Sequence, residues 1–411
     1  MKIRIFSAWF LFGILALAVF SASCGESRRP GAPGTPGNPT PPGSNPPPPA
    51  APSQGGFAAG IGGAGQNSAA HFLVVSQVPG TTPFPTVIGS SGTLTAAKAS
   101  TNPNQPFNAM AIDGAIDPSG KFFYQAAWPG LNAFTIDRNT GNLTEMPNSP
   151  YEPSQNFDGV AVDQLGKFVY GYANGQIFAF SIQAGTGQLT PIAGSPFPAA
   201  ASAQVTAFAV GGLAVSQDDK FLFVGTTSGI LGYAIDATTG ALTVVPGSPF
   251  GGSAGQAFAI VAPASGFLYE ATQGGKTPIY GYKIDPSSGA LSAIPGSPFG
   301  SDCSTSNLTS PASGKFLFAA NCGMYQIDAT SGALSFLFAD PLAPNSFWAV
   351  FDPASEFVWE LSSQEPCFHC DMGVTTFQVD PNTARMTEVP NSFLFITNSE
   401  VGAVSSMAIT Q

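Results

Sequence analysis

The sequence predicts an all-β fold, a β-propeller with seven blades of four antiparallel strands each. Three observations support this prediction: a composition unsuited to long helices, a motif that occurs seven times, and two chain ends that complete one blade. Gly and Pro number 48 and 38 among the 411 residues, and they are the poorest helix formers. Repeats of about 40–50 residues with four short strands are typical of propeller blades.

A turn motif of the form I-D-x-x-T-G-x-L-T recurs along the chain. Aspartate suits the start of such a turn because its side chain bonds the nearby backbone, and glycine takes the left-handed position that follows. Each copy therefore predicts a hairpin. The copies lie at 90–95, 136–144, 181–190, 235–243, 284–292, 327–335 and 379–387. The last copy has Ala384 in place of the glycine, so we expect its turn to be altered.

A second motif, P-x-S-G-K-F followed by an apolar run, lies upstream of the first in most repeats and predicts another hairpin. It is clearest at 117–124 (DPSGKFFY) and 310–318 (SPASGKFLF). A third motif, GSPF, stands at 194–197, 247–250 and 296–299 and connects one repeat to the next. Each repeat therefore supplies four short antiparallel strands.

The two ends of the repeat region each carry part of a blade. Residues 71–76 (HFLVVS) match a second strand that has no first strand before it. Residues 405–410 (SSMAIT) match a first strand with nothing after it. We expect the C-terminal strand to join the N-terminal blade and close the ring, which removes an open sheet edge.

The first 23 residues have the pattern of a secretory signal peptide. Lys2 and Arg4 form a positive end, an apolar run spans 5–22, and small residues precede Cys24. This arrangement resembles the lipobox of bacterial lipoproteins, in which the cysteine is lipid-modified and becomes the mature N-terminus. The alternative is an uncleaved membrane anchor of about 18 apolar residues. Both place the rest of the chain outside the cytoplasm, anchored to a bacterial membrane.

A tether rich in Pro, Gly, Ser and Ala follows at 24–70. A segment of this composition cannot bury a core and acts as a spacer. The propeller is therefore expected over 71–411, held to the membrane through lipid on Cys24, and we expect it to be a monomer.

The charge balance limits the ligands. With 13 Lys and Arg against 24 Asp and Glu, the net charge is −11, which excludes a nucleic-acid binder with a basic footprint. In a propeller, the loops into the first strand and from the second to the third share one face, and only Lys98 and Lys276 among the basic residues of the blades map there. The carboxylates that map to this face are Glu152, Asp158, Asp302, Asp340, Glu365, Asp371 and Glu400. Phosphorylated sugars need converging cations, so this acidic face disfavours them.

Together, the turn motifs resemble those of the seven-bladed lactonase-like propellers, a family similar to 6-phosphogluconolactonases and carboxymuconate cyclases. The resemblance covers about 71–410. It implies Arg and His at the start of the innermost strands and an Asn-Glu segment after a second strand. The first of these features is missing at 104–111, 154–161, 255–262 and 345–352, which contain neither Arg nor His. Residues 359–362 are faintly similar to the second.

We therefore predict a binding or scaffolding role on the acidic face, around Asp158, Asp302, Glu360 and His369. The ligand class stays open between a small molecule, a glycan and a protein. The alternative is a hydrolase or isomerase acting on a neutral sugar lactone or a related cyclic acid. We expect no cofactor, although the same carboxylates could use a divalent metal.

Four cysteines remain after Cys24, an even number in an oxidising compartment. Cys303 and Cys322 flank the predicted turn at 311–314 symmetrically, so we pair them as a disulfide. Cys367 and Cys370 enclose His369 in a long loop of the last blade, where we expect a second, small disulfide. A redox-active thiol pair and a zinc site built from these cysteines and His369 are the alternatives.

Overall fold

The computed structural model describes most of the predicted propeller. The described residues are 71–78, 83–88, 91, 93–97, 110–198, 212–226, 228–251, 257–263, 266–272, 278–300, 305, 307–352, 354–363, 372–397 and 403–409. The predicted signal peptide (1–23), Cys24 and the tether (24–70) lie outside them, so those assignments stay predictions. No described segment forms a helix of the length and apolarity needed to cross a membrane.

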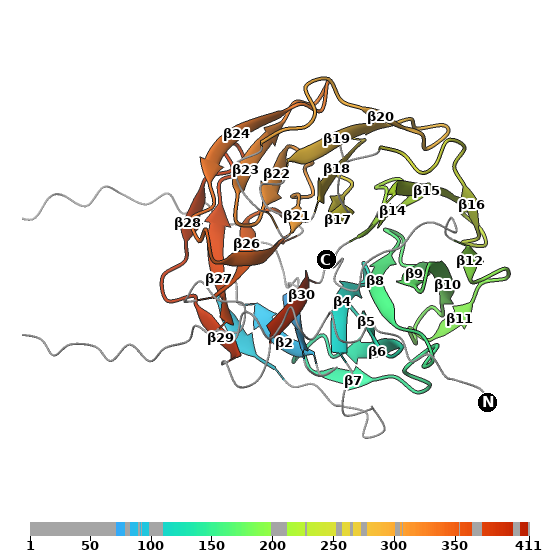
Figure 1. Ribbon diagram of the computed structural model, residues 1–411. Helices are drawn as coiled ribbons and strands as arrows, with labels where there is room; N and C mark the ends of the chain where they lie inside the picture. Colours follow the sequence, from blue (N-terminus) through green and yellow to red (C-terminus); the bar gives the residue numbers. More distant parts are fainter. Residues whose placement is uncertain are drawn as a thin grey trace, which may run out of the picture. The chain divides into compact units, whose positions relative to one another are not determined.

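Seven antiparallel sheets form a ring, and the prediction of a seven-bladed all-β propeller is confirmed (Figure 1). The innermost strands are β4 (Met110–Ile116), β8 (Phe157–Val162), β13 (Leu213–Val215), β17 (Ala257–Val261), β21 (Leu308–Thr309), β25 (Ser346–Phe351) and β30 (Ala403–Ile409). The second strands are β1 (His71–Val78), β5 (Phe122–Trp128), β9 (Phe168–Ala173), β14 (Phe221–Thr226), β18 (Phe267–Thr272), β22 (Phe316–Ala319) and β26 (Phe357–Ser363).

The outer half of each blade completes the sheet. The third strands are β2 (Phe84–Ile88), β6 (Leu131–Ile136), β10 (Gln176–Ile182), β15 (Gly229–Ile235), β19 (Ile279–Ile284), β23 (Gly323–Ile327) and β27 (Met372–Val379). The outermost strands are β3 (Leu94–Ala96), β7 (Leu143–Glu145), β11 (Leu189–Pro191), β16 (Leu242–Val244), β20 (Leu291–Ala293), β24 (Leu334–Ala339) and β28 (Met386–Glu388). Two short strands, β12 (Phe197–Pro198) and β29 (Leu394–Thr397), pair with β10 and β27.

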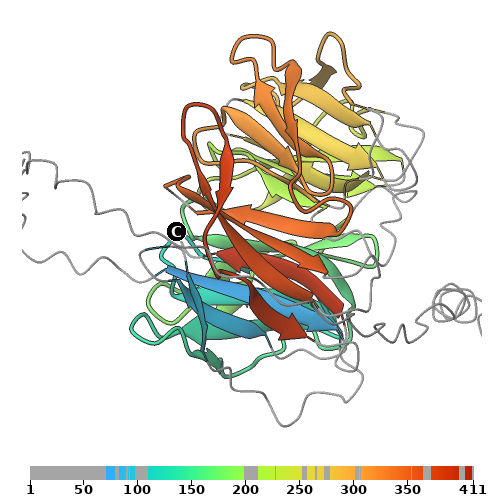
Figure 2. The ribbon, with the colours of Figure 1, turned by 90° about the vertical axis from the view of Figure 1, so that its left-hand side faces the viewer.

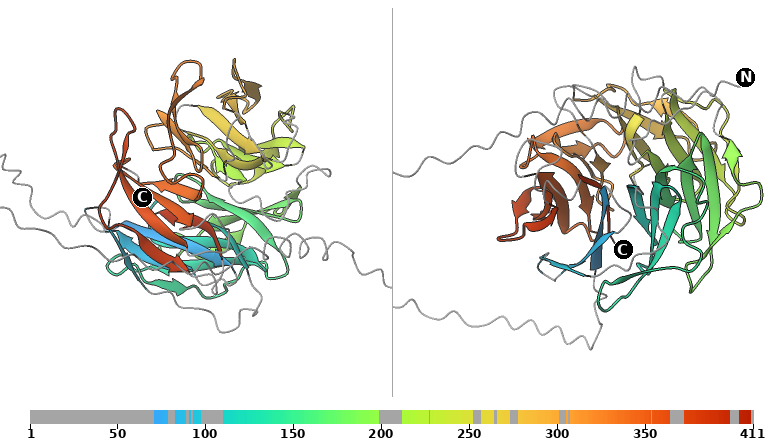
Figure 3. Two further views of the ribbon diagram at one scale, coloured as in Figure 1. Left: turned by 60° about the vertical axis from the view of Figure 1, so that its left-hand side comes forward. Right: turned by 60° about the horizontal axis from the view of Figure 1, so that its bottom comes forward.

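Strands from the two ends of the propeller segment close the ring, as predicted. We number the blades from this closure: blade 1 holds β30 and β1–β3, and blades 2 to 7 begin with β4, β8, β13, β17, β21 and β25. Strand β30 pairs antiparallel with β1 from Leu73↔Ile409 to Val78↔Ala403. Figures 2 and 3 show the blue strands of blade 1 beside the red strands of blade 7 and of β30.

The hydrophobic core is divided among the junctions between blades. Seven clusters of buried side chains occur, and each contains residues of two neighbouring blades. The cluster between blades 3 and 4, for example, joins Tyr170 and Tyr172 to Leu222 and Val224. Because each middle strand packs against a neighbour on both faces, its side chains are apolar or small. This packing accounts for much of the low charge content.

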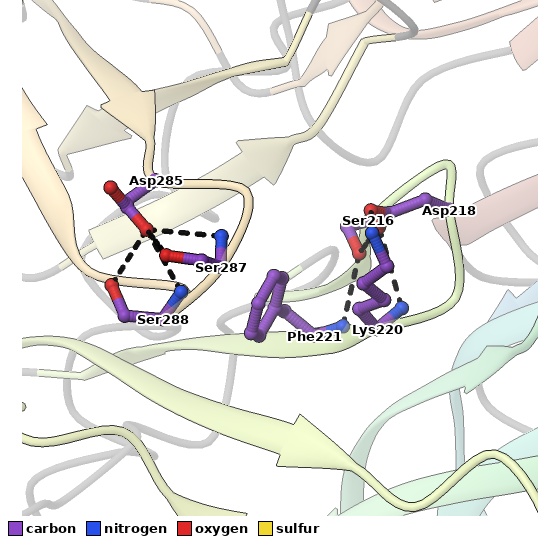
Figure 4. A network of polar contacts seen from close by, with 7 residues as sticks. All are labelled: Ser216, Asp218, Lys220, Phe221, Asp285, Ser287 and Ser288. Carbon is purple, nitrogen blue, oxygen red and sulfur yellow. Dashed lines mark hydrogen bonds and ion pairs between the residues drawn. The ribbon is translucent and has the colours of Figure 1, made fainter.

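Side-chain caps form the turns that the repeated motifs predict. In blade 5, Asp285 Oδ1 accepts the backbone N–H groups of Ser287 and Ser288 at 3.0 and 2.8 Å (Figure 4). These bonds and those from the two serine hydroxyls hold the pKa of Asp285 below its usual value. In the neighbouring blade, Ser216 Oγ accepts the N–H of Phe221 at 3.0 Å, and the Phe221 ring points toward the Asp285 turn.

In several of the Asp-initiated turns, the glycine contacts the preceding blade closely. Gly240 of blade 4 has φ +72°, and a Cβ there would lie 2.5 Å from the Phe168 ring of blade 3. The Tyr170 hydroxyl donates to the Gly240 carbonyl at 3.1 Å. The same three-residue contact recurs at Gly187 with Phe122 and Tyr124, and at Gly332 with Phe267 and Tyr269. We call it the glycine clasp.

Ala384 keeps the turn geometry, so the expectation of an altered last turn is wrong. Asp380 Oδ1 still accepts the N–H groups of Asn382 and Thr383, at 2.9 and 2.8 Å. Ala384 itself takes the left-handed conformation, with φ +58°. Its methyl group is buried in the cluster that also contains Phe316, and this packing opposes the cost of a left-handed alanine.

The GSPF segments do more than connect repeats. The serine hydroxyl accepts an N–H of the third strand beyond the end of the short outermost strand, as Ser195 does from Ala179 at 2.9 Å. The following phenylalanine then pairs with the start of that strand, as Phe197 does with Ile177. The motif therefore covers the outer edge of the blade.

Two glycines of one turn provide a test of the clasp. Gly185 and Gly187 both have positive φ, +87° and +74°, but a Cβ meets nothing within 4 Å at Gly185 and overlaps Phe122 at Gly187. We expect Gly187→Ala to lower the free energy of unfolding by about 1–3 kcal/mol more than Gly185→Ala. Denaturant unfolding of both variants measures the difference, and equal losses would show that the close contact carries no stability.

Candidate active site

The two faces of the ring differ in charge. We call the face where innermost strands begin and second strands end the channel face, and the other the turn face. The described Lys and Arg residues all lie in or beside turns of the turn face: Lys121, Arg138, Lys167, Lys220, Lys283, Lys315 and Arg385. Glu152, Asp158 and Asp340 lie on the channel face, which confirms the predicted sorting for these residues. Lys98, Lys276, Asp302, Glu365, Asp371 and Glu400 lie outside the described residues.

A cavity of about 220 Å³ lies among the innermost strands. Six blades contribute to its lining, and no Lys, Arg or His is among the described residues that line it. Lining residues from the six blades are Met407, Asp113, Val160, Leu213, Asn307 and Trp348. The cavity is smaller than the roughly 300–1,000 Å³ of most ligand pockets, which suits a single small ring.

Asp113 is the carboxyl group of this cavity, on β4. The pairing of β4 with β5 shifts register between Ala111 and Asp113, and Asp113 is 6% exposed. Its Oδ1 accepts the N–H of Gly114 at 2.8 Å, and its Oδ2 accepts that of Val160 in blade 3 at 3.2 Å. Burial raises the pKa of Asp113 to about 6, although both hydrogen bonds favour the ionised form.

Sequence reasoning overlooked Asp113. The signal that could have found it is a lone acidic residue within an innermost strand of otherwise small and apolar residues, MAIDGAI. Asn307 makes the corresponding bond between blades 6 and 7, because its Oδ1 accepts the N–H of Ala349 at 3.1 Å. A polar residue at this place therefore connects blades, and only in blade 2 does the chain use an acid for it among the bonds described here.

Asp158, a predicted site residue, lies at the start of β8 on the channel face. It occupies the register shift between Phe157 and Gly159 and is 8% exposed. Its Oδ1 accepts the indole N–H of Trp128 from blade 2 at 3.1 Å. Burial raises the pKa of Asp158 to about 7, and the Trp128 bond opposes this rise.

Asp113 and Asp158 share the junction between blades 2 and 3. Asp113 Oδ2 bonds Val160, two residues after Asp158, and lies 3.7 Å from the place of a Cβ on Gly159. Side chains that titrate near neutral pH can donate and accept protons in catalysis, and they cluster at functional sites. The arrangement thus places one such carboxyl group, Asp113, in the cavity lining and a second, Asp158, at the same junction between blades.

Glu360 does not join this pair. It lies on β26 of blade 7, and two blades separate it from Asp158 on the shorter way round the ring. It is fully buried, and burial together with the charge of Asp340 raises its pKa well above the usual value. Neither Glu360 nor Asp158 is among the described residues that line the cavity, and their grouping in one site stays a prediction. Asp302 and His369 lie outside the described residues.

The cysteine predictions are tested only at Cys322, which is disulfide-bonded. Its predicted partner Cys303, and Cys367 and Cys370, lie outside the described residues, so the pairings stay predictions. Within the described part of the chain, no group of three or more His, Cys, Asp and Glu side chains could hold a metal ion.

Comparison with known proteins agrees with the fold. A family model described as "Lactonase, 7-bladed beta-propeller" matches residues 173–305. A candidate 6-phosphogluconolactonase from Bacteroides fragilis is similar in structure, with a TM-score of 0.61, 14% identity, and coverage of 84% of this chain and 99% of that one. The periplasmic gluconolactonase of Pseudomonas aeruginosa is also similar, with a TM-score of 0.56, 14% identity, and coverage of 83% of this chain and 99% of that one. No curated protein matches the chain by sequence.

At these low sequence identities, the structural similarity supports only the fold. The family match, although it spans only 173–305, points to the same fold as the seven four-stranded blades and their closure by β30. Together these findings show a seven-bladed β-propeller in which residues 173–305 are similar to the lactonase family of such propellers.

Proposed function

We propose that the chain is a hydrolase that opens a small uncharged lactone at the central cavity, with Asp113 and Asp158 as its proton-transfer groups. One observation carries the proposal: a buried carboxyl group with a pKa near neutral, Asp113, lines the cavity, and a second one, Asp158, lies at the same blade junction. A binding role without turnover, favoured by the sequence, requires no such pair. We therefore place hydrolysis first and binding second.

The different hydrogen bonds of the two acids suggest their roles. Asp113, with the lower pKa of about 6 and two backbone N–H bonds, is the carboxylate that accepts a proton from the attacking water. The hydroxide adds to the lactone carbonyl carbon, and the ring C–O bond then breaks. Asp158, with the higher pKa of about 7, is the acid that protonates the departing ring oxygen. Two carboxyl groups with separated pKa values commonly divide acid and base roles in this way.

Electrostatics favour an uncharged substrate. The described residues of the cavity include an acid and no cation, and phosphate recognition relies on Arg or Lys. A 6-phosphogluconolactonase activity, the one after which a structural neighbour is named, would bring a phosphate toward Asp113 and Asp158. Glucono-δ-lactone avoids this repulsion.

Asparagine at position 113 tests the base. Asn307 shows that asparagine can accept the interblade N–H at this place in a blade, so we expect Asp113→Asn to fold. Loss of a general base should lower kcat for glucono-δ-lactone at least about 100-fold. Initial rates at pH 6.5, corrected for spontaneous hydrolysis, measure the change, and Glu152→Gln, a carboxylate of the same face outside the cavity lining, is the matched control. Wild-type protein that binds the lactone without turnover, or that prefers the 6-phosphorylated lactone, would contradict the proposal.

The pH profile tests the acid. The rate should rise as Asp113 ionises near pH 6 and fall as Asp158 loses its proton near pH 7. Trp128→Phe removes a hydrogen bond that favours the ionised Asp158, so the pKa of Asp158 should rise. We expect the alkaline limb of the kcat profile to move to higher pH while the acid limb stays. An unchanged alkaline limb would remove Asp158 from the mechanism.

We also propose that the protein lies outside the cytoplasm. This location is supported by the signal-like residues 1–23, the cysteine at position 24 and the tether at 24–70. Under this proposal a lipid on Cys24 anchors the enzyme to a bacterial membrane.

Fractionation tests the anchor. We expect the wild-type protein in the membrane fraction, with a diacylglyceryl group on Cys24 detected by mass spectrometry. The Cys24→Ser variant should lack this lipid. Wild-type protein with an unmodified Cys24 would overturn the lipid anchor.

A further inference from the structure

A group of buried oxygen atoms without partners lies at the junction of blades 6 and 7. Neither carboxyl oxygen of Glu360 has a hydrogen-bond partner, although the side chain is fully buried. The side-chain oxygens of Asn345 and Ser346 are also buried and without partners. Asn345 and Ser346 lead into β25, which pairs with β26, where Ala349 faces Glu360. Ser346 therefore lies beside Glu360, whose pKa it affects, and Asn345 is its neighbour in the chain.

Asp340 brings a second carboxyl group to this place. It is buried in the loop between β24 and β25, where Oδ1 accepts the N–H of Leu342 at 2.7 Å and Oδ2 that of Asn321 at 2.6 Å. Asp340 raises the pKa of the Glu360 carboxyl by its charge and a hydrogen-bond contact, and a hydrogen-bond contact from Ser346 lowers it, but neither contact has regular hydrogen-bond geometry. Two acids thus meet away from water, while every described Lys and Arg lies on the turn face.

The position of Glu360 in its strand does not by itself explain why its carboxyl group lacks a well-formed hydrogen bond. Glu270 occupies the corresponding place in the second strand of blade 5, where it pairs with Ile260 and Tyr280. It is equally buried, but its Oε2 accepts the Tyr282 hydroxyl at 3.1 Å. The chain therefore gives a buried glutamate a well-formed side-chain hydrogen bond in blade 5 and leaves Glu360 without one of regular geometry in blade 7.

The missing partner should be one that bonds several oxygens at once. Buried polar groups are normally satisfied, and each exception calls for an explanation such as an ion. We propose that Glu360, Asp340, Ser346 and Asn345 form a calcium site that fastens blade 7 to blade 6. Ca²⁺ takes oxygen ligands only, from carboxylates, amides and hydroxyls. With two carboxylates, we expect a weak site, with a dissociation constant of about 10⁻⁴–10⁻³ M, as in extracellular modules.

Thermal unfolding of the full chain after EDTA treatment tests the site. A ligand that binds only the folded state stabilises it, so we expect Ca²⁺ to raise the Tm by about 5 °C at a hundredfold excess over its dissociation constant. Glu360→Gln keeps the shape but removes the charge, and it should abolish this rise. Glu270→Gln, the matched control in blade 5, should retain it, and Mg²⁺ should act more weakly.

Terbium provides a second measurement that does not depend on stability. Tb³⁺ replaces Ca²⁺ at oxygen sites, and Trp359 next to Glu360 can excite it, so we expect Ca²⁺-displaceable luminescence from the wild type and from Glu270→Gln. Ser346→Ala should weaken it if Glu360→Gln fails to fold. The proposal is overturned if Ca²⁺ changes neither the Tm nor the luminescence of the wild type. A Glu360→Gln variant more stable than a Ca²⁺-insensitive wild type would instead indicate a proton shared between Glu360 and Asp340.

Discussion

Close packing between neighbouring blades is the constraint on which the ring depends, and the glycine clasp is one form that this packing takes. A four-stranded blade has two apolar faces, so it is stable only when blades cover both. The clasp sets the distance and angle of that contact, because the Phe168 ring lies where a side chain at Gly240 would be, and Tyr170 bonds the glycine carbonyl. The clasp recurs at three junctions, those of blades 2 and 3, 3 and 4, and 5 and 6. Strand β30 completes the ring.

Packing at the junctions also determines where the acids of the channel face can act. The seven hydrophobic clusters exclude water from the spaces between blades. A carboxyl group at such a junction loses hydration, and its neutral form gains in stability. Asp113 and Asp158 share one junction, where burial brings their pKa values close to neutral, whereas Glu360 and Asp340 share another, where Glu360 has no partner at regular hydrogen-bond geometry. The same packing that builds the ring thus gives rise to the two buried acid pairs on which both proposals rest.

Much of the architecture could be predicted because each blade repeats the same local chemistry. Asp285 and the other turn aspartates mark hairpins whose bonds span only two or three residues, so the pattern is visible in a single repeat. Ala384 misled the prediction, since burial of its methyl group could not be known from the turn alone. Asp113 was missed for a related reason: its partner Val160 is 47 residues away, and its proximity follows only from the packing of two blades.

The sequence by itself determined the class of fold, the number of blades, the closure by strands from both ends and the separation of charge between the faces. These properties follow from strand order and turn chemistry, which are local. Only the tertiary structure decided which acids become neighbours. Asp158 and Glu360 both map to the channel face, yet the ring places them on blades 3 and 7. Proximity across a ring depends on how blades pack, and burial then sets the pKa of each carboxyl group, so the candidate site emerged from the fold rather than from a motif.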